Sequence, residues 1–341
     1  MDPVSQGAIG AAFAKAGASD KSIRAKYISI AWLGCAAGMA PDLDVLIASP
    51  TDPLLFLEFH RHFTHALVFI PIGAAIVCGA LYWFARKHLS WREAYLACLF
   101  GYATHGLLDA CTSYGTQLFW PFSDTRVAWN NVSVVDPLFT IPLVTLVVLA
   151  ARRHKPVFSY IAVGWVVLYL GIGAIQLYRA EAATTQLAQS RGHEPLRLTM
   201  KPSFGNLIVW KSIYEHEGNY YVDGIRTGAD VSWCSGDVAP KLNIARDLPE
   251  WRQGSQQATD LERFRWFSQD YLAPTGEPGG VTDVRYSVVP NEIEPMWGIT
   301  LSSNVTQDTH VDWWASRDTS ARVWNKLGSL ISGSACAPVP L

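Results

Sequence analysis

Charged residues are scarce in this chain of 341 residues: they make up 16% of it, whereas hydrophobic residues make up 50%. No long lysine or arginine run occurs and the formal net charge is −2, so the chain lacks the basic surface of a nucleic-acid-binding protein. With a mean hydropathy of +0.13, the composition predicts a membrane protein. The 14 tryptophans and 13 tyrosines agree, since these residues favour membrane interfaces.

Closely spaced cysteine pairs are also absent, because none of the six cysteines belongs to a CxxC motif. Cys234 and Cys336 lie in the polar C-terminal half and could form a disulfide if that half is outside the cytoplasm. The other four lie in apolar stretches and are expected to be small buried residues: Cys35, Cys78, Cys98 and Cys111. The first 26 residues also lack the basic region and apolar core of a cleaved signal peptide.

Hydrophobic stretches predict about five transmembrane helices. Two are free of internal charge and long enough to cross roughly 30 Å of hydrocarbon: residues 64–86 and 157–178. Two others contain ionisable residues: residues 93–115 and 132–151. The stretch over residues 27–49 is interrupted by a proline and two aspartates and is expected to be a short or broken helix.

Lysine and arginine cluster before the first of these stretches, between the second and third, and between the fourth and fifth. In a five-span arrangement these clusters share one side of the membrane. The positive-inside rule then places them in the cytoplasm with the N-terminus. The C-terminal half is therefore expected to be an extracytoplasmic domain of a multi-pass inner membrane protein.

Hydropathy drops after about residue 181, and the remaining sequence predicts a β-rich α+β soluble domain over residues 181–341 after a helical membrane domain over residues 1–180. Three runs have strand composition, and the last two predict a hairpin across Glu217 and Gly218: residues 196–200, 206–216 and 219–225. Aromatic residues at helical spacing predict one helix over residues 260–273.

Ionisable side chains gather at one end of four predicted spans, near the outer face of the membrane in this orientation. An ionisable group within a span is costly and is by default functional. They are Asp42 and Asp44 in APDLD, His60 and His65 in HRHFTH, His105 and Asp109 in HGLLD, and Asp136 in VVDP. His105 and Asp109 are four residues apart, so they share one helix face.

Imidazole and carboxylate together suit Zn²⁺ or another transition metal, and these seven residues predict a site for one to three divalent ions. Five of the seven residues also have a plainer explanation. Asp42 or Asp44 could cap a helix end, and Asp136 could only start a helix. His105 with Asp109 could be a hydrogen-bonded pair between helices.

The motifs also resemble those of a known family. The opening MDPVSQGAIGAAFAKA, then APDLD, HRHFTHA, HGLLDACTSYGTQLFWPF and VVDPLF are similar to the YdjM-type family of inner-membrane, metal-dependent hydrolases over about the first 180 residues. The resemblance implies metal ligands at His60, His65, His105 and Asp109, with Asp42 and Asp44 beside them. It also implies a distant similarity to the helical zinc-dependent phospholipase C and single-strand nuclease superfamily.

Three positions depart from the family pattern. Many members have histidine where this chain has Gln6, whose loss as a ligand would leave one metal more open or absent. His62 replaces a small residue and Ala66 replaces a serine. His62 itself is expected to be a solvent-facing loop residue.

A metal site of this kind predicts hydrolysis, because a bound metal lowers the pKa of its water from near 16 to about 7 and stabilises developing negative charge. Asp44 or Asp109 could accept the proton. Arg61 or Arg126 could pair with an anionic oxygen, or could anchor at lipid headgroups. The expected substrate is a lipid-like ester or phosphoester that approaches from the bilayer.

Two other classes of protein also use ionisable residues at such positions: ion transporters and non-catalytic scaffolds. An ion transporter would need polar groups through the inner half of the membrane, which the predicted spans lack. A non-catalytic, metal-stabilised scaffold that binds a partner protein stays open, and the C-terminal half carries no motif that assigns it a function.

Overall fold

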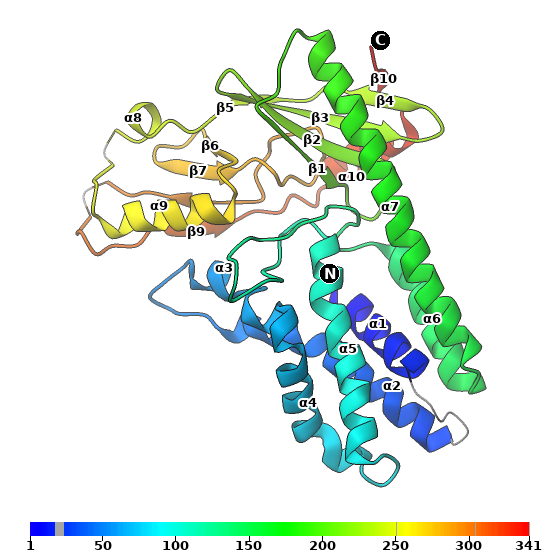
Figure 1. Cartoon of the computed structure of the whole chain (residues 1–341). Coiled ribbons are helices and arrows are strands. Elements are labelled where there is room, and N and C mark those ends of the chain that lie inside the picture. The colour runs from blue at the N-terminus through cyan, green and yellow to red at the C-terminus, as the bar shows by residue number, and fades with distance from the viewer. Residues whose placement is uncertain (18–23, 250, 304, 341) are drawn as a thin grey trace. The chain divides into compact units, whose positions relative to one another are not determined.

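A computed structural model of the chain describes residues 1–17, 24–249, 251–303 and 305–340. The chain divides into two compact units (Figure 1). The N-terminal unit comprises Met1–Ile47, Phe59–Ala174 and Phe204–Asn206. The C-terminal unit comprises Ala48–Glu58, Ile175–Ser203 and Leu207–Leu341. The predicted helical N-terminal half and β-rich C-terminal half are confirmed.

Helices make up the N-terminal unit. They are α1 (Pro3–Gly17), α2 (Arg24–Met39), η1 (Ala40–Leu46), η2 (Phe63–His65), η3 (Leu67–Phe69), α4 (Ile70–Ala85), α5 (Trp91–Cys111), α6 (Pro137–Arg153) and the first part of α7 (Val157–Ser190). Helix α5 begins with a capping box in which Ser90 and Glu93 satisfy each other's backbone N–H groups. Asp136 caps α6, and Pro137 follows it at the first helical position.

Glycines allow α1, α2 and α5 to approach closely. A Cβ at Gly101 of α5 would lie 2.3 Å from the carbonyl oxygen of Gly34 in α2, and one at Gly10 of α1 would lie 2.4 Å from the same oxygen. Small residues of this kind let helix backbones touch. The contact brings the end of α2, and the aspartates that follow it, close to α5, the helix that contains His105 and Asp109.

Two helices have the length and hydropathy of a membrane span among the described residues: Leu67–Ala85 and Val157–Ser190. Large apolar side chains such as Ile76, Trp83 and Val167 are exposed on them, as lipid-facing residues are. The prediction of about five spans is therefore wrong. Helices α2 and α6 have 16 and 17 residues, and α5 carries charged residues at both ends.

Two antiparallel sheets form the C-terminal unit. The first has six strands in the order β1-β2-β3-β4-β10, with β5 also paired to β3, and the second has the order β6-β7-β8-β9. The strands are β1 (Arg197–Pro202), β2 (Val209–His216), β3 (Asn219–Thr227), β4 (Val231–Cys234), β5 (Val238–Pro240), β6 (Leu272–Pro274), β7 (Gly280–Asp283), β8 (Trp297–Thr300), β9 (Asp312–Ala315) and β10 (Ala337–Pro338).

The predicted hairpin is formed by β2 and β3, with His216 opposite Asn219. Glu217 and Gly218 between them both have positive φ, at 46° and 72°. Two such residues are typical of a type I′ turn, whose twist matches that of the flanking strands. Buried Trp210 of this sheet packs against Ala183 and Leu187 from the second part of α7.

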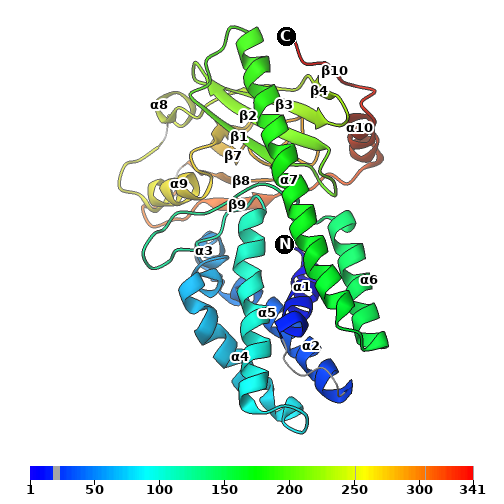
Figure 2. The same ribbon diagram turned by 45° about the vertical axis from the view of Figure 1, so that its right-hand side comes forward.

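Three further helices belong to the C-terminal unit: α8 (Ile244–Asp247), α9 (Gln256–Phe267) and α10 (Ala321–Ser332). Helix α9 is the one predicted over residues 260–273. It begins earlier because Ser255 caps it, and it ends earlier because Gln269 and Asp270 adopt positive φ. Figure 2 shows α9 beside β9 within this unit.

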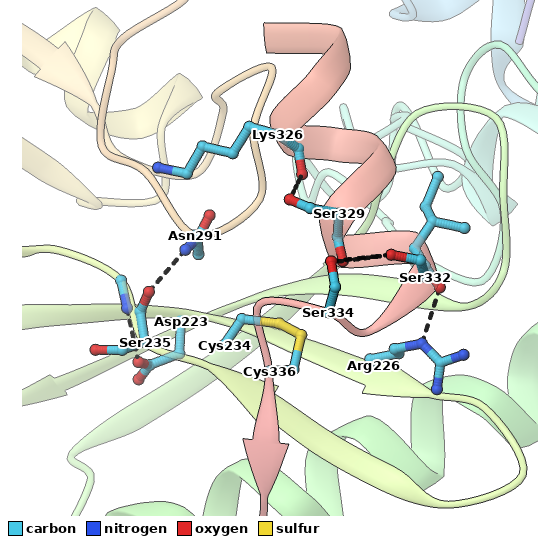
Figure 3. The surroundings of a disulfide bond; sticks show 12 residues. Asp223, Arg226, Cys234, Ser235, Asn291, Lys326, Ser329, Ser332, Ser334 and Cys336 are labelled. Atoms are coloured by element: carbon cyan, nitrogen blue, oxygen red, sulfur yellow. Dashed lines mark hydrogen bonds between the residues drawn. A yellow bond between two sulfur atoms is a disulfide. The ribbon is translucent and has the colours of Figure 1, made fainter. Parts of the chain in front are cut away.

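Cys234 at the end of β4 and Cys336 before β10 form a disulfide (Figure 3). The bond closes a loop with a sequence separation of 102 residues. The other four cysteines are free, and three of them are buried as expected: Cys78, Cys98 and Cys111. Disulfides persist in oxidising compartments and are rare in the cytosol.

The short segment Ala48–Glu58 belongs to the C-terminal unit although the flanking sequence does not. Arg263 of α9 binds it through Asp52 at 2.8 Å and Glu58 at 2.5 Å. Phe56 of the short helix α3 (Leu55–Phe59) stacks edge-on against Trp313, with ring centroids 5.3 Å apart. Ion pairs and aromatic packing therefore fix this segment.

Candidate metal centre

Three elements of the N-terminal unit bring histidine and aspartate together. The 3₁₀ helix η1, which begins where Pro41 ends the regular helix α2, supplies Asp42 and Asp44. His65 ends η2, and His105 shares the last turns of α5 with Asp109. His65, His105 and Asp109 are fully buried, whereas Asp42 is partly exposed.

Four ligand atoms from these elements converge on one point. The Nε2 atoms of His65 and His105 are 2.9 Å apart. Asp42 Oδ1 lies 3.5 Å and 3.3 Å from the same two nitrogens, and Asp109 Oδ2 lies 3.4 Å and 3.7 Å from them. A tetrahedral metal with bonds of 2.0–2.1 Å has ligand atoms about 3.3 Å apart. The four atoms are therefore spaced as ligands of one ion would be.

The Nδ1 atoms of His65 and His105, the ring nitrogens that do not take part in this convergence, already have polar partners. His105 donates its Nδ1 proton to the carbonyl oxygen of Gly38 at 2.6 Å, and His65 Nδ1 lies 3.2 Å from Asp44 Oδ2. Because these oxygens only accept, each Nδ1 carries a proton and each Nε2 is left with a lone pair. Two lone pairs facing at 2.9 Å repel unless a proton or a metal ion lies between them. Such outer partners are typical of metal-binding histidines.

The carboxylates around His65 favour a positive charge, either on the His65 imidazole or on a bound metal ion. Burial alone would lower the pKa of His65, but hydrogen bonds to Asp109, Asp42 and Asp44 raise this pKa to about 10. Although burial raises the pKa of Asp42 and of Asp44, hydrogen bonds from histidines hold both well below their usual range. Both aspartates are therefore ionised and could act as metal ligands. Without a metal, a second proton on His65 balances them, and metal binding would release that proton.

A second grouping shares Asp42 with the first and adds Asp44 and His60. His60 Nδ1 lies 2.8 Å from Asp44 Oδ1, and the His60 side chain is 32% exposed. Solvent can therefore reach the second grouping at His60.

Comparison with known proteins agrees with the geometry. The sequence profile of the YdjM inner membrane protein family matches residues 1–180, more than half of the chain. This chain belongs to the YdjM family. The resemblance carried by its motifs is thereby confirmed, and every residue of the metal centre lies inside the matched region.

One curated relative that matches is the uncharacterized protein YfhP of Bacillus subtilis (strain 168). It is 28% identical over 106 residues, which are 31% of this chain and 32% of YfhP. The alignment thus spans about a third of that relative's length. No solved structure matches the YdjM-family chain.

Asp109 of the YdjM-family chain has three partners that motif analysis did not assign to it. The amino group of Met1 contacts Asp109 Oδ1. Gln6 Nε2 donates to the same oxygen at 2.9 Å, and Arg61 Nε lies 3.0 Å from Oδ2. Gln6 therefore holds a candidate ligand in place. A main-chain amine and the carbonyl of Gly38 leave no signal in side-chain motifs.

Arg61 and Asp44 form more contacts with neighbouring residues than the sequence predicted. Buried Arg61 forms an ion pair with Asp109 and so neutralises its charge. The hydrogen bond from Arg61 Nη1 to Thr112 Oγ1 at 2.9 Å fixes the guanidinium in this position. Asp44 accepts hydrogen bonds from Thr64 Oγ1 and the Arg61 backbone N–H, in addition to its contacts with the histidines. This carboxylate is therefore placed to position ligands.

The structure does not bring Asp136 into either grouping. Its Oδ1 accepts from the backbone N–H groups at the start of α6, and its Oδ2 accepts from Tyr169 at 2.8 Å. The plainer explanation, a helix start, fits. Arg126 is buried and donates to the carbonyl oxygen of Gly115. His62, which is partly exposed in a loop and outside both groupings, packs its ring against Phe59, Phe63 and Trp120.

A third grouping, Asp52 with Asp260 and His310, lies in the C-terminal unit. Arg263 already occupies it, with Nη1 2.9 Å from Asp260 and 3.0 Å from Asp52. Since a guanidinium provides the positive charge, this group is an ion-pair network.

Proposed function

We propose that this YdjM-family protein is a membrane-embedded, metal-dependent hydrolase that cleaves a lipid-like ester or phosphoester at the outer face of the membrane. The observation that carries the proposal is the pair of imidazole Nε2 atoms that face each other 2.9 Å apart between two carboxylates. Buried donor sets of this composition suit Zn²⁺.

A divalent metal held by Asp42, His65, His105 and Asp109 would supply Lewis acidity and, if a water molecule joined as a fifth ligand, would lower the pKa of that water. His60 is the residue placed to take up a proton, because it is partly exposed and its Nδ1 is held by Asp44 at 2.8 Å. This arrangement leaves the second ring nitrogen available as an acceptor, oriented by a carboxylate as in other hydrolases. Asp44 acts through His60.

Two cation-rich turns of the N-terminal unit support the proposed sidedness. The turns after α4 and α6 lie at the opposite end of the N-terminal unit from the C-terminal end of α5 (Figure 2), and both turns carry lysine and arginine. Asp109 belongs to the last turn of α5. The positive-inside rule favours placing these turns in the cytoplasm and the metal centre outside.

The Cys234–Cys336 disulfide independently favours a C-terminal unit outside the cytoplasm. A phosphatase reporter that is active only in the periplasm, fused after the last residue, is expected to be active. A cytoplasmic reporter fused at the same place should be silent, and the reverse pattern would overturn the orientation.

The activity test uses the purified, metal-loaded full chain with two chromogenic substrates in micelles, a choline phosphodiester and a medium-chain carboxylic ester. We expect turnover of at least one substrate, and we expect His105→Ala to abolish it. His88→Ala is the matched control, because His88 is exposed in the turn after α4. Equal turnover by His105→Ala and the wild-type protein would exclude this centre as the source of the hydrolytic activity.

The second candidate is a metal-stabilised scaffold without catalysis. It is favoured by the ion pairs of Asp109 with Met1 and Arg61, which tie the N-terminus to α5. Stoichiometric metal without turnover of either ester class would support this alternative.

A further inference from the structure

Several large apolar side chains of the N-terminal unit are exposed outside both candidate membrane spans. Three of them, Leu43, Val45 and Leu46, belong to η1. The other two, Phe119 and Phe122, follow α5 in the same unit, and Phe122 is 86% exposed. Exposed apolar groups of this size usually mark a surface that contacts a partner or a membrane.

The side chains of η1 divide between two environments. Asp44 Oδ2 lies 3.2 Å from His65 Nδ1, and Asp42 Oδ1 lies 3.5 Å from His65 Nε2. Leu43 lies between these aspartates in the sequence and Val45 follows them, and both are exposed. The charged side chains of η1 therefore contact the metal centre, whereas apolar side chains one residue away are exposed.

Main-chain hydrogen bonds hold the segment before the two phenylalanines beside the metal centre. The Gln117 N–H donates to the Arg61 carbonyl oxygen at 3.0 Å, and the Leu67 N–H donates to the Leu118 carbonyl oxygen at 3.0 Å. Leu67 is also the first residue of a candidate span, two residues after His65. The phenylalanines are therefore attached at the same end of this span as the metal centre.

This exposed surface continues the apolar surface of the span Leu67–Ala85. Val68, Ile72 and Ile76 of the span are exposed, and η1 contacts α4 as well as η2. No lysine or arginine occurs in η1 or in residues 119–122, so neither segment offers a cation to a phosphate headgroup. Since the chain belongs to an inner membrane protein family, the partner that this surface fits is the acyl region of the bilayer.

We propose that five residues form an apolar rim that inserts among the lipid acyl chains beside the metal centre: Leu43, Val45, Leu46, Phe119 and Phe122. Insertion removes their exposed surface from water and holds the metal centre at the boundary between hydrocarbon and headgroups. A lipid whose chains pack against the apolar rim has its ester linkage at this boundary, near Asp42. This route for the substrate rests on the hydrolase proposal, whereas the insertion itself does not.

Nitroxide labels on introduced cysteines measure the insertion, with the purified full chain in phospholipid nanodiscs. Oxygen concentrates in hydrocarbon whereas a nickel chelate stays in water, so the ratio of their collision rates with a label gives its depth. We expect labels on Val45→Cys and Phe122→Cys to favour oxygen and to approach the ratio of Ile76→Cys within the span. The wild-type chain, labelled in parallel, gives the signal of its own free cysteines.

Val238→Cys is the matched control, because Val238 of β5 is 56% exposed and Val45 is 54% exposed. Its label should favour the nickel chelate. Labels at positions 45 and 122 that favour nickel to the same extent would overturn the proposal. Labels that neither reagent reaches would indicate a protein partner or a second copy on this surface, and would also overturn it.

The substrate route is tested by a charge in the apolar rim. Leu46 is exposed, so Leu46→Glu leaves the packing of η1 intact. Because a charge is costly among acyl chains, this variant should lower turnover of a long-chain ester in the discs at least about fivefold relative to a water-soluble short-chain ester. Val238→Glu should leave this ratio unchanged, and an unchanged ratio in Leu46→Glu would overturn the route.

The two readouts separate this proposal from the hydrolase proposal. Labels that favour oxygen in a chain that cleaves neither ester would support the apolar rim and refute the hydrolase. Metal-dependent cleavage by a chain whose labels favour nickel would support the hydrolase and overturn the apolar rim.

Discussion

A methyl group added at Gly106 should disable the metal centre without removing a ligand. Gly106 lies on α5 directly after His105, where α5 passes the backbone of His65. A Cβ at this position would lie 2.2 Å from the carbonyl oxygen of His65. Gly106→Ala must therefore push the His65 segment and α5 apart.

The required displacement follows from the contact distances. Ordinary contact of a Cβ begins at 3.4 Å, so the backbone of His65 must move by about 1.2 Å, the difference between 3.4 and 2.2 Å. Tyr102 donates to the Thr64 carbonyl oxygen at 2.9 Å, and the Leu67 N–H donates to Leu118 O at 3.0 Å, so both sides of His65 resist this movement. Metal–ligand distances tolerate only about 0.2 Å.

We expect Gly106→Ala to lower metal affinity at least about 100-fold, the upper end of what loss of an outer-shell partner costs. Affinity is measured by competition with a chromogenic chelator on the purified full chain. Gly79→Ala on α4 is the matched control, because a Cβ there meets nothing within 4 Å. If Gly106→Ala folds with the thermal stability of Gly79→Ala and binds metal like the wild-type protein, the assignment of His65 as a ligand is refuted.

Three further changes test other parts of the structure. Asp44→Asn should weaken metal binding about 10-fold to 100-fold in the chelator assay, because an amide has no charge and only one acceptor oxygen where the carboxylate that orients His65 has two, and an unchanged affinity would contradict that role. Arg263→Met should lower the free energy of unfolding of the C-terminal unit by roughly 3–5 kcal/mol in urea titrations, because it leaves the fully buried Asp260 without its cation. A loss below about 1 kcal/mol would mark the network as energetically neutral. Burial lowers the pKa of Lys211 to about 7 from 10.5, so the unfolded chain binds more protons between these pH values and stability should rise with pH across this window. Lys211→Met should flatten the rise in melting temperature between about pH 7 and 9, and an unaltered slope would exclude Lys211 as its source.

Local patterns predicted several features because neighbours in the sequence decide them. The four-residue spacing of His105 and Asp109 places both on one face of α5, whatever surrounds the helix. Glu217 and Gly218 specify a tight turn through their own backbone conformations. Both features were therefore available from the sequence alone.

The number of membrane spans was overestimated because an apolar composition does not determine the length of a helix. Pro41 ends α2 after 16 residues, and α6 stops after 17 at His154, which adopts a left-handed conformation. The aspartate that caps α6, Asp136, looked like a ligand because capping and metal binding use the same carboxylate.

Tertiary contacts account for what motif analysis could not supply. The Met1 amine and the Gly38 carbonyl act through the main chain, which every residue shares. Arg61 neutralises Asp109 from 48 residues away. The division of the chain at Ala48–Glu58 depends on Arg263, more than 200 residues further on.

X-ray absorption at the zinc edge, combined with elemental analysis of the purified full chain, tests the central claim most directly. Asp42, His65, His105 and Asp109 predict at least one bound divalent ion per chain, with nitrogen and oxygen neighbours at about 2.0–2.1 Å and the outer-shell signal of two imidazoles. His105→Gln should lose one imidazole contribution or the ion itself. A chain that binds no stoichiometric metal after zinc, manganese and iron loading, or a spectrum dominated by sulfur, would contradict the claim.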